Sequence, residues 1–482
     1  MGGPVPSAPA SCPRTTTGPP AIYRPRRPAA TVLHRTVREH LETFLAESQA
    51  GDDDLRPIRP AAERALREYL RCGIPAHGFA RVRCAACKHE YLVAYSCKVR
   101  DICPSCGTRR MVETAAHLVD LVLPRVPYRQ WVLSVPKRVR WFLKHDPAVI
   151  DGFARIFLRL VETTIRQASP DAPKGARFGA ILFVHRFGDA LNSHIHFHVL
   201  VTDGVFCADP DDPTRSQFHP ATDLDATRIK AVANQMRHRG LRWLVRHEHL
   251  DTDAAREMGE WRHDGGWSVD ARVQIPAWDR HGLERLARYC ARPAMSGGRL
   301  GRLNDDLLVY RLRRPAIDGR TEILLNPLQF LERLVDLLAP PRKHRHRYFG
   351  VLAPGARLRQ AVTATAGPAG TVLQELAAAR KAMGLSDERK RPASRTWALL
   401  LARIYENRPL QCPHCGQAMT ILAFILEKEV IERILRHIGE DPHPPRILPA
   451  RSPPQLEMPF AQTTGPVTWP EMDQTAGFPD DA

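Results

Sequence analysis

Three histidines alternate with apolar residues in the run His194-Ile-His-Phe-His-Val-Leu-Val201. Because successive side chains of a β-strand point to opposite faces, the run predicts a strand with its imidazoles on one face and its apolar residues on the other. An apolar run at 178–186 precedes it, and the Gly188-Asp189 pair between them predicts a turn. The two runs should therefore form an antiparallel hairpin in mixed α/β surroundings.

The alternating histidines suggest a divalent metal site. Neighbouring side chains on one strand face stand about 7 Å apart, so two imidazoles can reach one ion but three in a row are generally too spread. We expect His196 and His198 to be the ligand pair. His194 is either a third ligand or a neighbouring group that contacts DNA.

A helix is expected from about residue 279 to 292, where Leu283, Leu286 and Cys290 recur at helical spacing. Asp279 can cap it and Pro293 ends it. Tyrosine on a helix is usually a packing residue or a surface anchor. Tyr289, however, borders the apolar stripe, and three cations that could bind DNA phosphate lie near it in the sequence: Arg285, Arg288 and Arg292.

The cysteines are clustered in a way that suits zinc. Cys84-x2-Cys87 is followed after 15 residues by Cys103-x2-Cys106, a spacing that predicts four thiolates around one structural zinc ion. The flanking residues Cys72, Cys97 and His77 are either alternative ligands or small buried residues.

Basic residues surround these cysteines and predict a DNA-binding module, with a solvated surface as the plainer interpretation. The candidates for DNA contact are Lys98, Arg100, Arg109 and Arg110. Farther along the chain, Cys412-x2-Cys415 supplies half of a possible second zinc site. Its remaining ligands could be His414, His437 and His443.

The charge of the whole chain also favours a polyanionic partner. Its 482 residues include 70 Lys plus Arg against 52 Asp plus Glu, a formal net charge of +18, which favours nucleic acid. We find neither an apolar run long enough to cross a membrane nor a signal peptide, so we expect a cytoplasmic protein without a membrane partner.

Composition and periodicity divide the chain into five parts. We expect disordered proline-rich tails at 1–30 and 446–482. Between them we expect a helical, zinc- and DNA-binding domain at 31–120, a catalytic domain at 121–345, and a C-terminal region at 346–445 that is mainly helical and carries the second cysteine pair. The segment 340–347, Pro-Pro-Arg-Lys-His-Arg-His-Arg, should be a basic linker.

Taken in order, these motifs resemble the rolling-circle insertion-sequence transposases of the HUH endonuclease superfamily. The resemblance covers most of residues 31–450 and rests on His196-Phe197-His198, on Arg288-Tyr-Cys-Ala-Arg-Pro293, and on both cysteine motifs. It implies an α+β fold whose central antiparallel sheet carries the histidine pair, with flanking helices and a small N-terminal zinc-binding domain. It also implies catalytic Mg2+ or Mn2+.

The same resemblance implies that Tyr289 is the nucleophile that nicks and rejoins single-stranded DNA at element ends and in target DNA. The intermediate would be a covalent 5′ phosphotyrosine. Some relatives carry a second tyrosine four residues earlier, where this chain has Arg285. We therefore expect a single catalytic tyrosine, and a homodimer is one way to supply a second nucleophile. The alternatives are an HUH relaxase or replication initiator, and a non-catalytic zinc-dependent DNA-binding protein.

Overall fold

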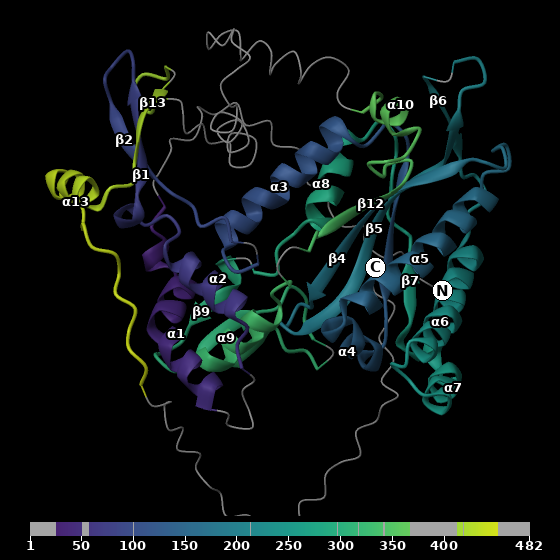
Figure 1. Cartoon of the computed structure of the whole chain (residues 1–482), viewed down its shortest axis with the longest axis horizontal. Coiled ribbons are helices and arrows are strands. Elements are labelled where there is room, and N and C mark those ends of the chain that lie inside the picture. The colour runs from purple at the N-terminus through teal and green to yellow at the C-terminus, as the bar shows by residue number, and fades with distance from the viewer. Residues whose placement is uncertain are drawn as a thin grey trace, which may run out of the picture.

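The computed structural model describes most of the chain between residues 26 and 451 (Figure 1). The described ranges are 26–50, 57–99, 101–212, 214–295, 297–316, 318–340, 343–366, 412–417 and 419–451. Among these residues, no helix combines the length and the apolar character needed to span a bilayer. Both expected tails lie largely outside these ranges, as do Arg100 and the segment 367–411.

A seven-stranded antiparallel sheet forms the centre of the molecule, and its main path runs β12-β4-β5-β3-β7. The predicted hairpin is confirmed, because β4 (Arg177–Phe187) and β5 (Ser193–Ala208) are adjacent and antiparallel. The other strands are β3 (Tyr128–Ser134), β6 (Ser216–Pro220), β7 (Ser268–Asp270), β8 (Gln274–Ile275) and β12 (His346–Gly350). This part of the fold agrees with the expected α+β class.

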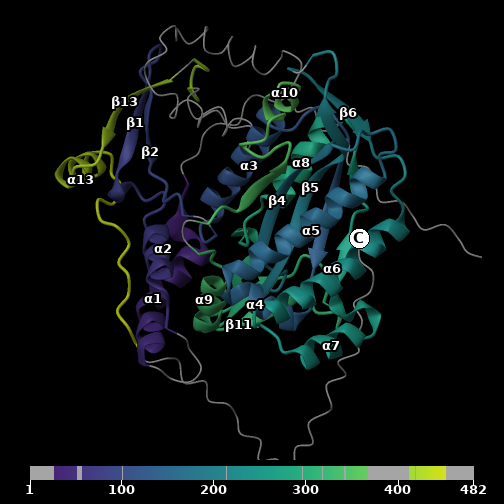
Figure 2. The same cartoon turned by 45° about the vertical axis from the view of Figure 1, so that its right-hand side comes forward.

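One face of the sheet packs against a layer of helices that is in front in Figure 2. They are α4 (Lys137–His145), α5 (Pro147–Gln167), α6 (Ala226–Arg246) and α7 (Thr252–Glu260). Phe197 points into this core with Trp131 and Phe153, and all three are fully buried. The apolar side of the histidine strand is thus covered, as its alternation predicts.

The opposite face carries α3 (Pro104–Leu121) and α8 (Arg280–Cys290), which pack on Phe183 of β4 and Leu200 of β5. The expected helix around Tyr289 is therefore present. The Asp279 carboxylate caps it by accepting a 2.7 Å hydrogen bond from the backbone N–H of Gly282. The imidazole face of β5 and the tyrosine helix consequently lie on the same side of the sheet.

A second apolar core joins the N-terminal helices to a later part of the chain. In it α1 (Val32–Ala50) and α2 (Pro60–Leu70) pack with α9 (Pro327–Asp336) and a small sheet. That sheet consists of β9 (Leu300–Arg302), β10 (Leu308–Arg311) and β11 (Glu322–Leu325). Packing therefore crosses the boundary expected at residue 120.

A third, small sheet joins the two ends of the described chain. Its order is β13-β1-β2, formed by β1 (Phe79–Cys84), β2 (Glu90–Ala94) and β13 (Met419–Ile425). The helix α13 (Lys428–His437) follows β13, and its Ile431 and Leu435 pack on Phe79. The described part of the expected helical C-terminal region thus contains a strand as well as a helix.

Two expectations about connecting segments need correction. The basic segment 340–347 is not a linker throughout, because its last two residues begin edge strand β12, which pairs with β4. The central sheet therefore extends beyond residue 345, and the short helix α10 (Arg359–Thr363) follows it. Residues 446–451 were expected to be part of a loose tail, but their backbone and side chains contact α1.

Candidate active site and metal centres

Three imidazoles from two neighbouring strands converge on the α8 side of the central sheet. His185 of β4 lies directly opposite His196 of β5 in the antiparallel register, and His198 follows on the same face. One ligating nitrogen from each ring can be chosen so that all three lie within 4.8 Å of one another. These atoms are close enough to share one metal ion.

Hydrogen bonds fix which nitrogen of two of these rings is available. Nε2 of His185 donates to the backbone carbonyl of Cys290 at 2.7 Å, which leaves Nδ1 buried and without a hydrogen-bond partner among the described residues. Nδ1 of His196 donates to the carbonyl of His194 at 3.0 Å, which leaves Nε2 free for a metal ion. Both rings therefore direct an unprotonated nitrogen toward the site.

The third ring, His198, depends on Gln130 of β3. Nδ1 of His198 lies 2.8 Å from the side-chain amide of Gln130, and its Nε2 is buried without a partner in the described structure. Burial lowers the pKa of His185 and His198 well below the usual value for histidine, and neighbouring imidazoles lower both further. Burial also lowers the pKa of His196, to about 4. All three rings are therefore neutral near pH 7, as metal ligation requires.

His194 was the expected third ligand, but the convergent group contains His185 instead. The ring of His194 lies 4.9 Å from that of His196, on the far side from His198 along the strand. Directly opposed residues on paired strands are closer than second neighbours along one strand, so β4 supplies the third imidazole. A register irregularity between His185 and Phe187 sets this pairing, and a hairpin closed directly at Gly188-Asp189 would have placed a different residue opposite His196.

Tyr289 extends from α8 toward these histidines. Its ring centroid lies 5.4 Å from that of His198, the two rings meet edge to face at 83°, and 42% of the tyrosine is exposed. The guanidinium carbon of Arg292 lies 4.5 Å from the centre of the Tyr289 ring and 5.4 Å from that of Phe187. Tyr289 is therefore both partly exposed and adjacent to the convergent imidazoles.

The other two arginines of this helix are less directly placed. Arg288 forms a 2.7 Å ion pair with Glu284, and the largely exposed Arg285 lies 3.7 Å from the Asp279 carboxylate. Of the three predicted phosphate contacts, Arg292, which lies just beyond the end of α8, is thus the one that packs on the tyrosine ring.

The four cysteines expected in one zinc site are divided between two clusters, so the predicted grouping is wrong. Cys103 and Cys106 lie with Cys72 and Cys97, while Cys84 and Cys87 lie with Cys412 and Cys415. In each cluster the four sulfur atoms lie within 4.8 Å of one another. The division arises because β1 and β2 carry the first cysteine pair away from the start of α3, where the second pair lies.

The cluster of Cys72, Cys97, Cys103 and Cys106 connects the N-terminal core to the tyrosine helix. Cys103 immediately precedes α3, and Cys106 lies in its first turn. At Gly107 an added Cβ would lie 2.9 Å from Cβ of Pro293, so α3 passes very close to the end of α8. A metal ion in this cluster would therefore stabilise the helix that packs on α8.

The basic residues near the cysteines have different surroundings. Arg109 forms a 2.7 Å ion pair with Glu113. Lys98, which adopts a left-handed backbone conformation with φ 57°, is exposed, and Arg110 is half-buried. None of these contacts tests DNA binding, which remains a prediction for these residues.

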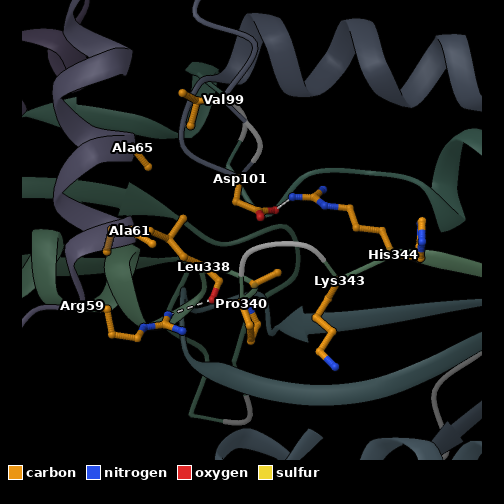
Figure 3. Close-up of a pocket in the computed structure, with 12 residues that line it drawn as sticks. Arg59, Ala61, Ala65, Val99, Asp101, Leu338, Pro340, Lys343 and His344 are labelled. Atoms are coloured by element: carbon orange, nitrogen blue, oxygen red, sulfur yellow. Dashed lines mark hydrogen bonds and ion pairs between the residues drawn. The ribbon is translucent and has the colours of Figure 1, made fainter.

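A pocket of about 330 Å3 is lined by residues of α2, by residues 338–340 and by residues 343–345 (Figure 3). Its two arginines already have partners, because Arg59 donates to the carbonyl of Leu338 at 3.0 Å and Arg345 pairs with Asp101. None of its lining residues belongs to the histidine and tyrosine site. We therefore assign the candidate chemistry to the sheet face beneath α8 and not to this pocket.

Comparisons with known proteins agree with this arrangement. Residues 179–360 match a family model described as "Putative transposase", and residues 36–135 match one described as "Transposase zinc-binding domain". The first match contains all three convergent histidines and Tyr289. The second contains six of the eight clustered cysteines.

Two curated proteins are similar over much of their length. A protein of Sinorhizobium fredii described as "Putative transposase y4qJ" is 24% identical over 418 residues, which are 81% of this chain and 97% of that protein. The "Transposase for insertion sequence element IS801" of Pseudomonas savastanoi pv. phaseolicola is 24% identical over 322 residues, 61% of this chain and 71% of that protein. No solved structure matches. This chain is therefore similar to transposases in two regions, one matching a transposase zinc-binding domain and one matching a second transposase domain.

Proposed function

We propose that this protein is a transposase, a metal-dependent HUH enzyme that nicks and rejoins single-stranded DNA at the ends of a mobile element, with Tyr289 as its only nucleophile. One observation carries the proposal. The accessible ring of Tyr289 packs against His198, whose Nε2 belongs to a group of three neutral imidazoles with convergent nitrogens. The names of the relatives support transposition over plasmid nicking.

The catalytic cation would be held by His185, His196 and His198. Bound there, a divalent ion supplies a Lewis acid that polarises a phosphate oxygen. The donor set fits such an ion, because two buried ring nitrogens have no other partner among the described residues. Three nitrogen donors suit Mn2+ better than Mg2+, which prefers oxygen ligands.

The tyrosine would attack the scissile phosphate. The phenol of Tyr289 gives up its proton as a bond forms between its oxygen and phosphorus, the bond from phosphorus to the 3′ oxygen breaks, and that oxygen takes up a proton. The products are a 5′ phosphotyrosine and a free 3′ hydroxyl, which can reverse the step without ATP. Arg292, which already packs on the phenol ring, would stabilise negative charge on the phosphate.

A structural zinc ion would occupy the cluster of Cys72, Cys97, Cys103 and Cys106. Three of its sulfur–sulfur separations are 3.5 to 3.7 Å, which suits a closed tetrahedral site. With six clustered cysteines, the matched zinc-binding domain has enough ligands for this site. The ion would stabilise α3 and, through α3, the position of Tyr289.

A second strand transfer needs either a second use of Tyr289 or a second chain. This chain has Arg285 one helical turn before Tyr289, so a homodimer would supply another nucleophile. We propose cytoplasmic DNA as the substrate, since the net charge of +18 favours a polyanion.

Covalent capture tests the proposal. Purified protein incubated with Mn2+ and labelled single-stranded oligonucleotides from the element ends should give a denaturant-resistant protein–DNA adduct. Tyr289→Phe should lose the adduct, while Tyr348→Phe, on edge strand β12 of the same sheet, should retain it. Equal adduct formation by Tyr289→Phe would reject this nucleophile.

The same experiment separates the alternatives. A non-catalytic DNA-binding protein would shift the oligonucleotide in a gel but give no adduct with any metal. A relaxase or replication initiator would form the adduct with a plasmid origin and not with element ends.

A further inference from the structure

We infer that Cys84, Cys87, Cys412 and Cys415 form a second zinc site, divided between the two ends of the described chain. The matched zinc-binding domain, residues 36–135, contains only half of these ligands. The site would fasten the C-terminal segment that contains β13 and α13 to the N-terminal module.

The sulfur atoms have the separations that a zinc ion needs. Sγ of Cys84 lies 3.4 Å from Sγ of Cys415, and Sγ of Cys87 lies 3.4 Å from Sγ of Cys412. Four sulfurs bound at about 2.3 Å from one zinc ion stand roughly 3.8 Å apart in tetrahedral geometry. Each of these two contacts joins a cysteine of the first motif to a cysteine of the second. The sulfur atoms of both motifs are therefore directed toward the same place.

The backbone of the first motif folds into a tight loop around its cysteines. The N–H of Cys84 donates to the carbonyl of His89 at 2.8 Å, and the N–H of Lys88 donates to the carbonyl of Cys84 at 3.1 Å. Lys88 adopts a left-handed conformation with φ 66°, which is uncommon for a residue other than glycine.

The second motif repeats this loop position by position. The N–H of Cys412 donates to the carbonyl of Gln417 at 2.7 Å, and the N–H of Gly416 donates to the carbonyl of Cys412 at 2.9 Å. Gly416, at the position equivalent to Lys88, has φ 72°. Two unrelated stretches of sequence thus adopt one loop geometry, in which both cysteines of each pair can bind a single ion.

The two loops also meet directly. The rings of His89 and His414 lie 4.1 Å apart between centroids, and neither imidazole belongs to the ligand group. His414 was one of the residues expected to complete a site with Cys412 and Cys415. The structure instead brings Cys84 and Cys87 to that position, so the site is made of four thiolates.

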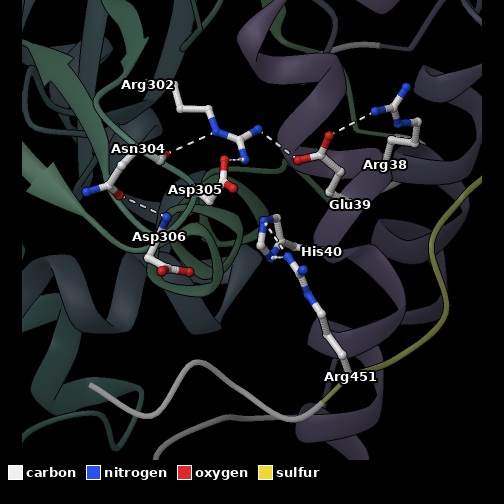
Figure 4. A network of polar contacts seen from close by, with 8 residues as sticks. All are labelled: Arg38, Glu39, His40, Arg302, Asn304, Asp305, Asp306 and Arg451. Carbon is white, nitrogen blue, oxygen red and sulfur yellow. Dashed lines mark hydrogen bonds and ion pairs between the residues drawn. The ribbon is translucent and has the colours of Figure 1, made fainter. Parts of the chain in front are cut away.

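The proposed zinc ion lies at one end of a longer attachment. Cys84 is opposite Met419 in the β1–β13 register, and Phe79, at the other end of β1, packs on α13. Beyond α13 the chain reaches α1, where the guanidinium of Arg451 lies 3.3 Å from the ring of His40 (Figure 4). Strand pairing, helix packing and this final contact fasten the same segment that the zinc ion would hold.

Zinc content of the full-length protein, measured by native mass spectrometry, tests the shared site. The wild type should bind two zinc ions per chain. Cys87→Ser and Cys415→Ser should each lose one ion, and the double variant should lose only that same ion, because both cysteines belong to one site. Cys207→Ser, outside both clusters, should retain two.

A second double variant controls for misfolding. Cys97→Ser removes a ligand of the other cluster, so combining it with Cys415→Ser should abolish zinc binding, whereas Cys415→Ser alone keeps one ion. The shared site is contradicted if Cys415→Ser still binds two ions. It is equally contradicted if combining Cys87→Ser with Cys415→Ser removes more zinc than either change alone, because the pairs would then bind separate ions.

Discussion

The imidazole of His185 donates a 2.7 Å hydrogen bond to the backbone carbonyl of Cys290, the residue that follows Tyr289. This bond attaches the tyrosine helix to the strand that supplies the third convergent imidazole. It also fixes the tautomer of His185, because a carbonyl can only accept, so the proton must be on Nε2. Binding of a metal ion by His185 would therefore be coupled to the position of Tyr289.

We predict that His185→Ala weakens Mn2+ binding strongly and abolishes adduct formation, because it removes a ligand and the bond to α8. His194→Ala is the matched control, since His194 lies beside the group without belonging to it. Isothermal titration with Mn2+ should show a loss of at least tenfold for the first variant and a smaller change for the second. If His194→Ala lost more Mn2+ affinity than His185→Ala, the third ligand would be His194 and not His185.

Gln130 should act as a positioning residue for His198. Ligation through Nε2 requires the proton on Nδ1, and Gln130 can accept a hydrogen bond from Nδ1–H once its amide presents the carbonyl oxygen. Gln130→Ala should therefore weaken Mn2+ binding about 10- to 100-fold, and Gln130→Glu, which keeps an acceptor, should lose less. Equal losses in both variants would indicate a packing effect instead.

Stability should fall in mild acid. The folded state lowers the pKa of His196 to about 4, whereas an unfolded histidine titrates near 6.5. As the pH falls from about 6.5 toward 4, the unfolded chain binds the proton first, so unfolding becomes more favourable by up to about 1.4 kcal/mol per pH unit for this group.

Urea unfolding without added divalent metal, measured at intervals between pH 7 and pH 4.5, checks this prediction. His196→Asn should reduce the pH dependence, because the variant lacks one titrating group. Both proteins share the acid sensitivity of the cysteine clusters, which cancels in the comparison. Identical pH dependence in the two proteins would contradict the assigned shift.

Local patterns in the sequence were sufficient for the elements that carry the chemistry. Alternation along β5 placed His196 and His198 on one face, and the spacing of Leu283 and Leu286 defined the helix of Tyr289. Each pattern involves residues within one element, where the backbone geometry fixes which side chains share a face.

The errors concern partners that only the folded chain brings together. Cys87 and Cys412 are 325 positions apart, and no periodicity in either motif specifies that pairing. Spacing along the sequence therefore grouped Cys84 and Cys87 with the next cysteine pair, Cys103 and Cys106, in one zinc site. The short strand β12 was missed for a related reason, since its basic residues become a strand by pairing with β4.

The most direct test of the account is the identity of the residue that becomes attached to DNA. Mn2+-dependent adducts, digested with nuclease and trypsin, should yield one modified peptide, with the nucleotide joined through its 5′ phosphate to the oxygen of Tyr289. A modification on any other residue, or a nucleotide joined through its 3′ phosphate, would contradict the proposed chemistry.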